Sequence, residues 1–343
     1  MRARFLAHPK AMGVARVCGR SYTAAMTIAF YDAAQVEELL DYPGCIAAMR
    51  EAMIALSSGE KPQPLRTIWP VGDGEMWGIM PGDLPALSTF GAKLVSVFRD
   101  LGRPGRTRHQ GVVVAFDGAT GAVSCIADAE PITKIRTACA SAVATDALAR
   151  ADAQVLAIFG GGVQAEAHLQ ALPLVRNFRE ILLWGRSPEK TRALAEQMGA
   201  LVGPAIAPVA DGEEAAARAD VICTVSSSSE PILFGAWVKP GTHVNLVGSS
   251  MLGPVEVDSA LVAGARYVAD YRTGVLAQAA ELAVAREAGI VDDSHVVAEI
   301  GEVLGGRAAG RERDDQITIY KSLGHVAQDL AAAAYLQERS SRG

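Results

Sequence analysis

The glycine-rich stretch at residues 155–168, VLAIFGGGVQAEAH, constrains the fold of this chain more than any other feature. Five apolar residues come first, which suits a parallel strand covered on both faces. Gly160, Gly162 and Ala165 then follow at the spacing G-x-G-x-x-A, which is typical of a dinucleotide-binding turn. The first glycine permits the turn, the second lets a pyrophosphate approach, and the small third residue lets the helix pack on the strand.

A helix after this turn would present free N–H groups and the positive end of its dipole to the pyrophosphate. Glycine loops also join strands to helices where no ligand binds, so a plain structural turn is the alternative. Because a strand precedes the glycines and a helix follows them, the sequence favours nucleotide binding.

The composition limits the class of protein. The chain has 343 residues, half of them hydrophobic, which is enough for a large core and about two domains. Its net charge of −6 is spread along the chain, so we expect no nucleic-acid partner. No apolar run approaches the roughly 20 residues that span a bilayer, so we expect no membrane partner either. The five cysteines are scattered along the chain: Cys18, Cys45, Cys125, Cys139 and Cys223. Their spacing predicts neither a metal site nor disulfides, and it favours a reducing, cytoplasmic compartment.

Residues 1–25 are basic, and no acidic residue occurs before Asp32. A transit peptide has this charge pattern, but the amphipathic periodicity that it also needs is weak. We expect a disordered tail or an upstream start codon, with Met26 as the beginning of the folded part.

The remaining chain divides into two kinds of pattern. Residues 62–130 contain five strand-like runs and a hairpin turn at Asp117-Gly118, which predicts a largely antiparallel sheet. A small-residue helix from Pro131 leads into the glycine stretch, after which strands and helices alternate, as in a doubly wound parallel sheet. We therefore predict an α/β Rossmann domain beside an α+β domain.

The second strand of the predicted Rossmann unit ends in Trp184-Gly185-Arg186-Ser187, with no acidic residue. An NAD site usually has an acid there to bind the ribose hydroxyls, whereas Arg186 and Ser187 suit a 2′-phosphate. This favours NADP(H) and leaves NAD(H) as the alternative. Ser226, Ser227 and Gly248 follow the fourth and fifth strands, where ligands of such sheets bind.

Three cationic residues, Arg66, Lys93 and Arg136, stand among apolar or small residues. Burying such a charge costs several kcal/mol unless an anion pairs with it, so these positions predict an anion site. For Lys93 the alternative is strand alternation, with its side chain on a solvated face.

Several short segments share a recognisable pattern: Pro64–Thr67 with Met80-Pro81, Gly91–Val95, His109–Val114 with Phe116-Asp117, Ile135–Ala138, Gly160–Ala165, Glu256–Asp258 and Lys321–Gly324. Taken together, they resemble the ornithine cyclodeaminase/mu-crystallin family of NAD(P)-dependent enzymes from about Ala29 to Leu336.

The resemblance implies a Rossmann domain, residues 135–315, inserted into a substrate-binding and dimerisation domain made of 26–134 and 316–343. It also implies a homodimer. Arg66, Lys93 and Arg136 would surround the substrate carboxylate, with Lys93 and Arg136 as catalytic residues and Ser322 and Gly324 beside them. The expected cofactor contacts are Thr137, Gly160, Gly162, Val163, Gln164, Ala165, Arg186, Ser187, Ser226, Ser227, Val247 and Gly248.

Three departures separate this sequence from true ornithine cyclodeaminases. Their Asp after the fifth strand aligns with Ser250, and their Glu before Met-Pro aligns with Gly78, with Glu75 the nearest acid. The acid that favours NAD is also missing. We therefore expect an NADPH-dependent reductase of a small ketimine, of the pyrroline- or piperideine-2-carboxylate type. The alternatives are an ornithine or lysine cyclodeaminase, an alanine-type dehydrogenase and a non-enzymatic crystallin-like binding protein.

Overall fold

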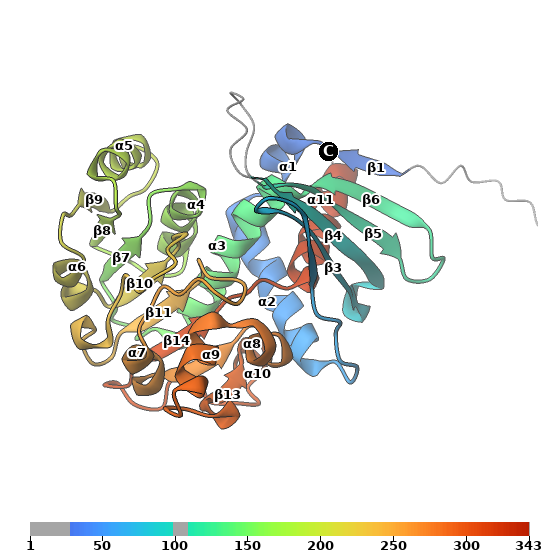
Figure 1. Cartoon of the computed structure of the whole chain (residues 1–343). Helices are drawn as coiled ribbons and strands as arrows, with labels where there is room; N and C mark the ends of the chain where they lie inside the picture. The colour runs from blue at the N-terminus through green and yellow to red at the C-terminus, as the bar shows by residue number, and fades with distance from the viewer. Residues whose placement is uncertain (1–27, 99–108, 343) are drawn as a thin grey trace, which may run out of the picture.

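The computed structural model describes residues 28–98 and 109–342, and these form two β-sheets joined by a long buried helix (Figure 1). The basic segment 1–25 lies outside the described residues. In the described part of the chain, no helix is long and apolar enough to cross a membrane.

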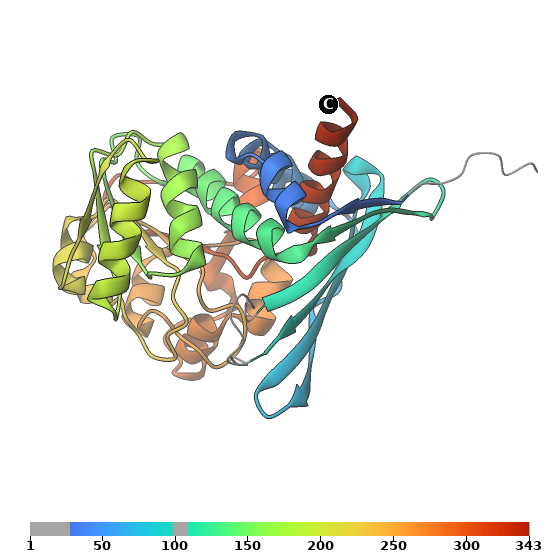
Figure 2. The same cartoon turned by 90° about the horizontal axis from the view of Figure 1, so that it is seen from above.

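The first sheet has six strands in the order β1-β6-β5-β4-β3-β2. All neighbours are antiparallel except β1 and β6, so the predicted largely antiparallel sheet is confirmed. Helices cover one face of this sheet, and the other face carries no helix of the described chain (Figure 2). The strands are β1 (Ala29–Tyr31), β2 (Thr67–Gly72), β3 (Glu75–Leu84), β4 (Thr89–Val97), β5 (His109–Asp117) and β6 (Val123–Asp128), and the helices beside them are α1 (Ala33–Leu39), α2 (Tyr42–Ser58) and α11 (Val326–Arg342).

The second sheet has eight strands in the order β13-β12-β14-β11-β10-β7-β8-β9, all of them parallel. Apolar clusters lie on both of its faces, as expected for a doubly wound sheet. The strands are β7 (Val155–Phe159), β8 (Glu180–Trp184), β9 (Ala205–Pro208), β10 (Val221–Thr224), β11 (His243–Leu246), β12 (Arg266–Ala269), β13 (Val296–Glu299) and β14 (Thr318–Lys321). The helices are α4 (Val163–Ala171), α5 (Pro188–Gly199), α6 (Gly212–Arg218), α7 (Ser259–Gly264), α8 (Arg272–Gln278), α9 (Ala280–Glu287) and α10 (Ile300–Leu304).

Strand β14 requires a correction to the expected domain boundary. The resemblance places residues 316–343 in the first domain, but β14 pairs with β11 and β12 inside the parallel sheet. A strand of four residues can join either sheet, and only the pairing shows which one it joins. The chain then leaves the parallel sheet through Ser322–His325 and enters α11, which packs on the six-stranded sheet.

Helix α3 (Ala129–Leu148) connects the two sheets. It packs against α2, α4 and α11, and Figures 1 and 2 show it crossing between the two halves of the molecule. Most of its residues are buried, and many are Ala, Ser, Thr or Cys, whose small side chains allow neighbouring helices to approach closely. Because α3 runs directly toward β7, one helix carries both Arg136 and the approach to the glycine turn.

Candidate functional site

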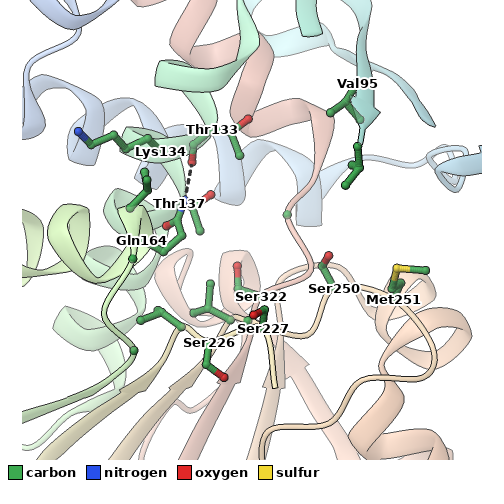
Figure 3. A pocket seen from close by; sticks show the side chains of 18 of the residues that line it. Val95, Thr133, Lys134, Thr137, Gln164, Ser226, Ser227, Ser250, Met251 and Ser322 are labelled. Atoms are coloured by element: carbon green, nitrogen blue, oxygen red, sulfur yellow. Dashed lines mark hydrogen bonds between the residues drawn. The ribbon is translucent and has the colours of Figure 1, made fainter. Parts of the chain in front are cut away.

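A cavity of about 790 Å³ lies between the six-stranded sheet and the carboxyl ends of the parallel strands. Figure 3 shows Thr133, Lys134 and Thr137 reaching it from α3, with Ser226 and Ser322 on the loops opposite. Both halves of the molecule therefore contribute walls to one space, at the position where ligands of open parallel sheets bind.

The glycine turn forms one end of this cavity. A Cβ atom on Gly160 would lie 2.9 Å from Val225, so this position has no room for a side chain. A Cβ on Gly162 would meet no atom within 4 Å, because this residue faces open space at the start of α4. The free N–H groups of α4 and the open side of Gly162 fit the pyrophosphate of a dinucleotide.

A buried carboxylate, Glu256, fixes the two loops beside the turn. Its Oε1 accepts hydrogen bonds from the N–H and hydroxyl of Ser226 at 2.7 and 2.8 Å. Its Oε2 accepts from the Gly248 N–H at 2.7 Å and the Thr224 hydroxyl at 2.9 Å. Burial raises the pKa of this carboxyl, and the donors around it work in the opposite direction. Glu256 therefore holds the ends of β10 and β11 at a fixed separation.

The loop after β8 forms the rim of the nucleotide end. Arg186 and Lys190 are exposed there and line the cavity, and the Ser187 hydroxyl caps α5 by accepting from the Lys190 N–H at 3.4 Å. The sequence motifs indicated only Arg186 and Ser187. Lys190 joins them because the first turn of α5 brings it to the same rim.

The opposite end of the cavity holds the cations. Lys93 and Arg136 are each only 4 % exposed, which decides against a solvated face for Lys93. Both bind Asp329 of α11: the Lys93 Nζ lies 3.2 Å from each carboxylate oxygen, and the Arg136 Nε lies 3.0 Å from Oδ1. Burial lowers the pKa of Lys93 to about 8, although Asp329 opposes this effect. Burial alone would raise the pKa of Asp329, but Arg136 and Lys93 hold it below its usual value.

Arg66 reaches the same end of the cavity from the segment before β2. Its Nη2 donates to the carbonyls of Leu323 and Gly324 at 2.7 and 2.6 Å. The N–H groups of these two residues donate in turn to Oδ2 of Asp270, each at 2.7 Å. The 323–324 turn is therefore held from both sides, with Arg66 on its carbonyls and Asp270 on its amides.

Gly324 lies between the two arginines. Its φ of +78° is in the left-handed region that favours glycine. A Cβ at this position would lie 2.7 and 2.8 Å from Nη1 and Nη2 of Arg136. The Arg136 guanidinium thus occupies space that only a glycine leaves free.

The structure brings together nearly all of the residues predicted from the sequence. Of these, Ala165 alone does not line the cavity; it is fully buried between α4 and the sheet, where a small residue permits close packing. Sequence reasoning missed Asp329, Asp270 and Glu256 as site residues. A signal existed for Asp329, because a carboxylate inside an alanine-rich apolar helix needs a buried partner.

The two positions expected to differ from ornithine cyclodeaminases also line the cavity. Gly78 of β3 and Ser250 both contribute to its wall, whereas Glu75, the nearest acid in sequence, does not. The wall around them is mostly apolar and includes Ile68, Met76, Met80, Val95, Val97 and Met251.

Residues 26–343 match the model of the ornithine cyclodeaminase/mu-crystallin family. The chain belongs to this family. Ketimine reductase mu-crystallin from Mus musculus is 33 % identical over 320 residues, which is 92 % of this chain and 98 % of the mouse protein. A Delta(1)-pyrroline-2-carboxylate reductase of Bacillus cereus is 32 % identical over 88 % of this chain and 94 % of its own.

Solved structures agree with this assignment. The Delta(1)-pyrroline-2-carboxylate reductase of Thermococcus litoralis, in complex with NADH and L-proline, superposes with a TM-score of 0.87 and 30 % identity over 92 % of this chain and 98 % of its own. The iminosuccinate reductase of Paracoccus denitrificans with NAD+ gives a TM-score of 0.86 and 28 % identity, covering 92 and 97 %. The predicted family, the Rossmann-type fold and the class of NAD(P)-dependent oxidoreductase are thereby confirmed.

Proposed function

We propose that this protein uses NADPH to reduce a small cyclic ketimine carrying a carboxylate, of the pyrroline- or piperideine-2-carboxylate type, to the L-amino acid. One observation carries the proposal: Arg66, Lys93 and Arg136 converge at one end of a cavity whose other end is the glycine turn. This arrangement would bind a carboxylate and a dinucleotide in one space, as hydride transfer to an imino acid requires. The family members named above as reductases support the same reaction.

The residues of the chain act mainly by positioning. The Arg136 and Arg66 guanidiniums bind the substrate carboxylate, and Lys93 adds positive charge beside them. When bound, the nicotinamide would supply the hydride to the carbon of the C=N bond, and solvent would supply the proton on its nitrogen. Thr137 and Ser226 line the space between the two ends and would orient the reacting groups. The apolar wall suits a compact ring better than a side chain that ends in a distal ammonium group.

The alternative of an ornithine cyclodeaminase fits the cavity less well. Such an enzyme needs carboxylates for the distal amine of ornithine, and neither Gly78 nor Ser250 supplies one. An alanine-type dehydrogenase would need free ammonia as a second substrate. A non-enzymatic binding protein would leave the convergence of three cations unexplained.

The deciding assay is NADPH oxidation by the purified protein with pyrroline-2-carboxylate or piperideine-2-carboxylate. We expect steady turnover and an L-amino-acid product. Conversion of ornithine to proline with NAD, together with no turnover of either imine, would make this a cyclodeaminase. Turnover of pyruvate only when ammonia is added would favour the alanine-type dehydrogenase.

We further propose that the protein prefers NADPH to NADH, because Arg186 and Lys190 are exposed cations after β8, where the adenosine ribose of a dinucleotide is expected. Replacing both by alanine should raise KM for NADPH by about ten- to a hundredfold, since two charge-assisted contacts are lost at an exposed site. The kinetic constants for NADH should barely change. Arg192→Ala on the same helix is the matched control, because Arg192 is exposed but does not line the cavity. Equal use of NADH and NADPH by the wild type would contradict this preference.

A homodimer and a cytoplasmic location complete the proposal. The uncovered face of the six-stranded sheet carries Phe30, Trp69, Trp77 and Phe90, which are 65, 43, 39 and 39 % exposed. Trp69 stacks on Trp77 with ring centroids 5.3 Å apart, and Phe90 stacks on Phe116 at 5.0 Å. An apolar surface of this extent favours contact with a second copy of the chain.

Light scattering should therefore give twice the mass of one chain. Trp77→Glu should shift the protein toward the monomer, because it places a charge in the apolar contact. Leu201→Glu is the matched control, since Leu201 is 70 % exposed on the opposite half of the molecule. A dimer that persists unchanged in Trp77→Glu would place the interface elsewhere.

A further inference from the structure

The Asp329 carboxylate is fully buried and forms ion pairs with both Lys93 and Arg136 at the cation end of the cavity. We propose that Asp329 is a positioning residue of the substrate-carboxylate site, and that it holds Lys93 and Arg136 toward the cavity as a shared counter-ion. The inference rests on the proposed function only in taking the bound group to be a carboxylate.

The contacts of Asp329 join three separate elements. The acid comes from α11, Lys93 from β4 and Arg136 from α3, at sequence separations of 236 and 193 residues. The neighbouring Gln328 accepts from the Arg136 Nη1 at 2.7 Å, and Thr133 accepts from the Lys93 Nζ at 3.3 Å. With Nε held by Asp329 and Nη1 by Gln328, the guanidinium plane is fixed with its two terminal nitrogens beside Gly324.

This arrangement explains why two long, flexible side chains would stay ready for a ligand. A free arginine or lysine loses most of its rotamer entropy when it is ordered. Here this rotamer entropy is lost when the chain folds, because both side chains are then bound to one fully buried acid. Binding a substrate carboxylate then requires little further ordering.

The charges also favour a bound carboxylate. Arg66, Lys93 and Arg136 bring three positive charges to this end of the cavity, and Asp329, whose pKa Arg136 and Lys93 hold below its usual value, brings one negative charge. Positive charge is therefore left in excess for an anion to neutralise. Without Asp329 the cations would repel one another at short range in a poorly hydrated space.

The protonation of Lys93 gives a readout specific to this role. Burial lowers its pKa to about 8, Asp329 opposes that change, and Arg136 and Arg66 add to it. Lys93 is charged below its pKa and neutral above it, so carboxylate binding should weaken as the pH rises through about 8. Removing Asp329 takes away the opposing charge and should move this loss to lower pH.

Other titratable groups near Lys93 do not produce the same shift. His325, which precedes α11, is buried, and burial lowers its pKa to about 4, so it stays neutral between pH 6 and 9. Glu130 and Lys134 of α3 also line the cavity, and both remain in place when Asp329 is replaced. The loss of carboxylate binding at high pH forms the alkaline limb of the binding profile. A shift of this limb along the pH axis would therefore report on the pair of Lys93 and Asp329.

The experiment compares wild type with Asp329→Asn, which keeps the shape of the side chain and removes its charge. Binding of pyrrole-2-carboxylate, a planar and unreactive carboxylate, is measured by calorimetry on the NADPH complex between pH 6 and 9, with kcat and KM for pyrroline-2-carboxylate in parallel. We expect at least tenfold weaker binding at pH 8, an alkaline limb shifted to lower pH, and NADPH affinity within twofold of wild type. Asp329→Glu, which restores the charge, should return the limb toward its wild-type position.

The matched control is Asp220→Asn. Asp220 is also buried, binds Arg150 at 3.0 Å and accepts from the Gln154 N–H at 2.8 Å, but it lies at the other end of the parallel strands. This variant should lose stability without moving the alkaline limb. If Asp329→Asn folds and keeps both the wild-type limb and the wild-type affinity, the inference is wrong.

The two proposals fail in different ways. If wild type binds pyrrole-2-carboxylate but reduces no imine, the reductase assignment fails, while the binding comparison still tests Asp329. If Asp329→Asn does not fold, Asp329→Glu decides through affinity, because it keeps the charge but its longer side chain displaces Lys93 and Arg136. Weaker binding of pyrrole-2-carboxylate would support the positioning role, and wild-type affinity would overturn it.

Discussion

Replacing Arg136 by alanine should lower kcat/KM for the imino acid roughly 1000-fold, which corresponds to about 4 kcal/mol. The arginine is buried, and its guanidinium lies beside Gly324 at the substrate end of the cavity. NADPH affinity should change little, because the glycine turn and the Glu256-supported loops remain in place. Steady-state kinetics and fluorescence titration with NADPH measure the two effects separately.

The lysine variant provides the control for this experiment. Arg136→Lys keeps a positive charge beside Asp329, so the fold should tolerate it better than Arg136→Ala, which leaves Asp329 with Lys93 as its nearest partner. Lysine cannot reproduce the planar fork that holds a carboxylate through two nitrogens, so kcat/KM should still fall by about a hundredfold. Loss of NADPH binding together with turnover would show that Arg136 supports the structure rather than the substrate.

Gly324→Ala should also lower activity strongly, though less than Arg136→Ala. Its backbone φ of +78° costs an alanine on the order of 1 kcal/mol or more. The new methyl group would also meet the Arg136 guanidinium at 2.7 Å and force it to move. We expect kcat/KM to fall by about a hundredfold and the melting temperature to fall as well, the first measured by steady-state kinetics and the second by calorimetry.

Gly121→Ala is the control for this prediction, because it introduces backbone strain without displacing Arg136. Gly121 has a φ of +73° in the β5–β6 turn, and a Cβ there would meet nothing within 4 Å. This variant should therefore lose a similar amount of stability through strain and keep its kinetic constants. If the two variants lose activity equally, the effect of Gly324→Ala does not come from Arg136.

Much of the site could be predicted because its signals are local. The turn at Gly160–Gly162 needs glycines at fixed spacing, and the end of β8 shows directly that no acid follows Trp184. Lys93 was detectable as a charge in an apolar strand, but whether it faced solvent or the core depended on which face the helices covered. The helices proved to cover its face, and Lys93 is buried.

The domain boundary could not be predicted from the sequence. Residues 318–321 have the pattern of a strand, yet nothing within these four residues tells which sheet they join. Their pairing with β11 and β12 depends on hydrogen bonds to strands that lie far away in the sequence. The segment that follows them, Ser322–Gly324, reaches the cavity only because β14 is central in the parallel sheet.

The amino-acid sequence by itself determined the glycine turn, the alternation of strands and helices, and the three cations, because each depends on neighbouring residues and their spacing. The tertiary structure alone decided that Asp329 binds Lys93 and Arg136, that Asp270 holds the 323–324 turn, and that Lys190 joins Arg186 at the rim. The physical reason is that a buried charge is stabilised by whichever partner the fold brings within about 3 Å, and these partners lie far apart in the sequence.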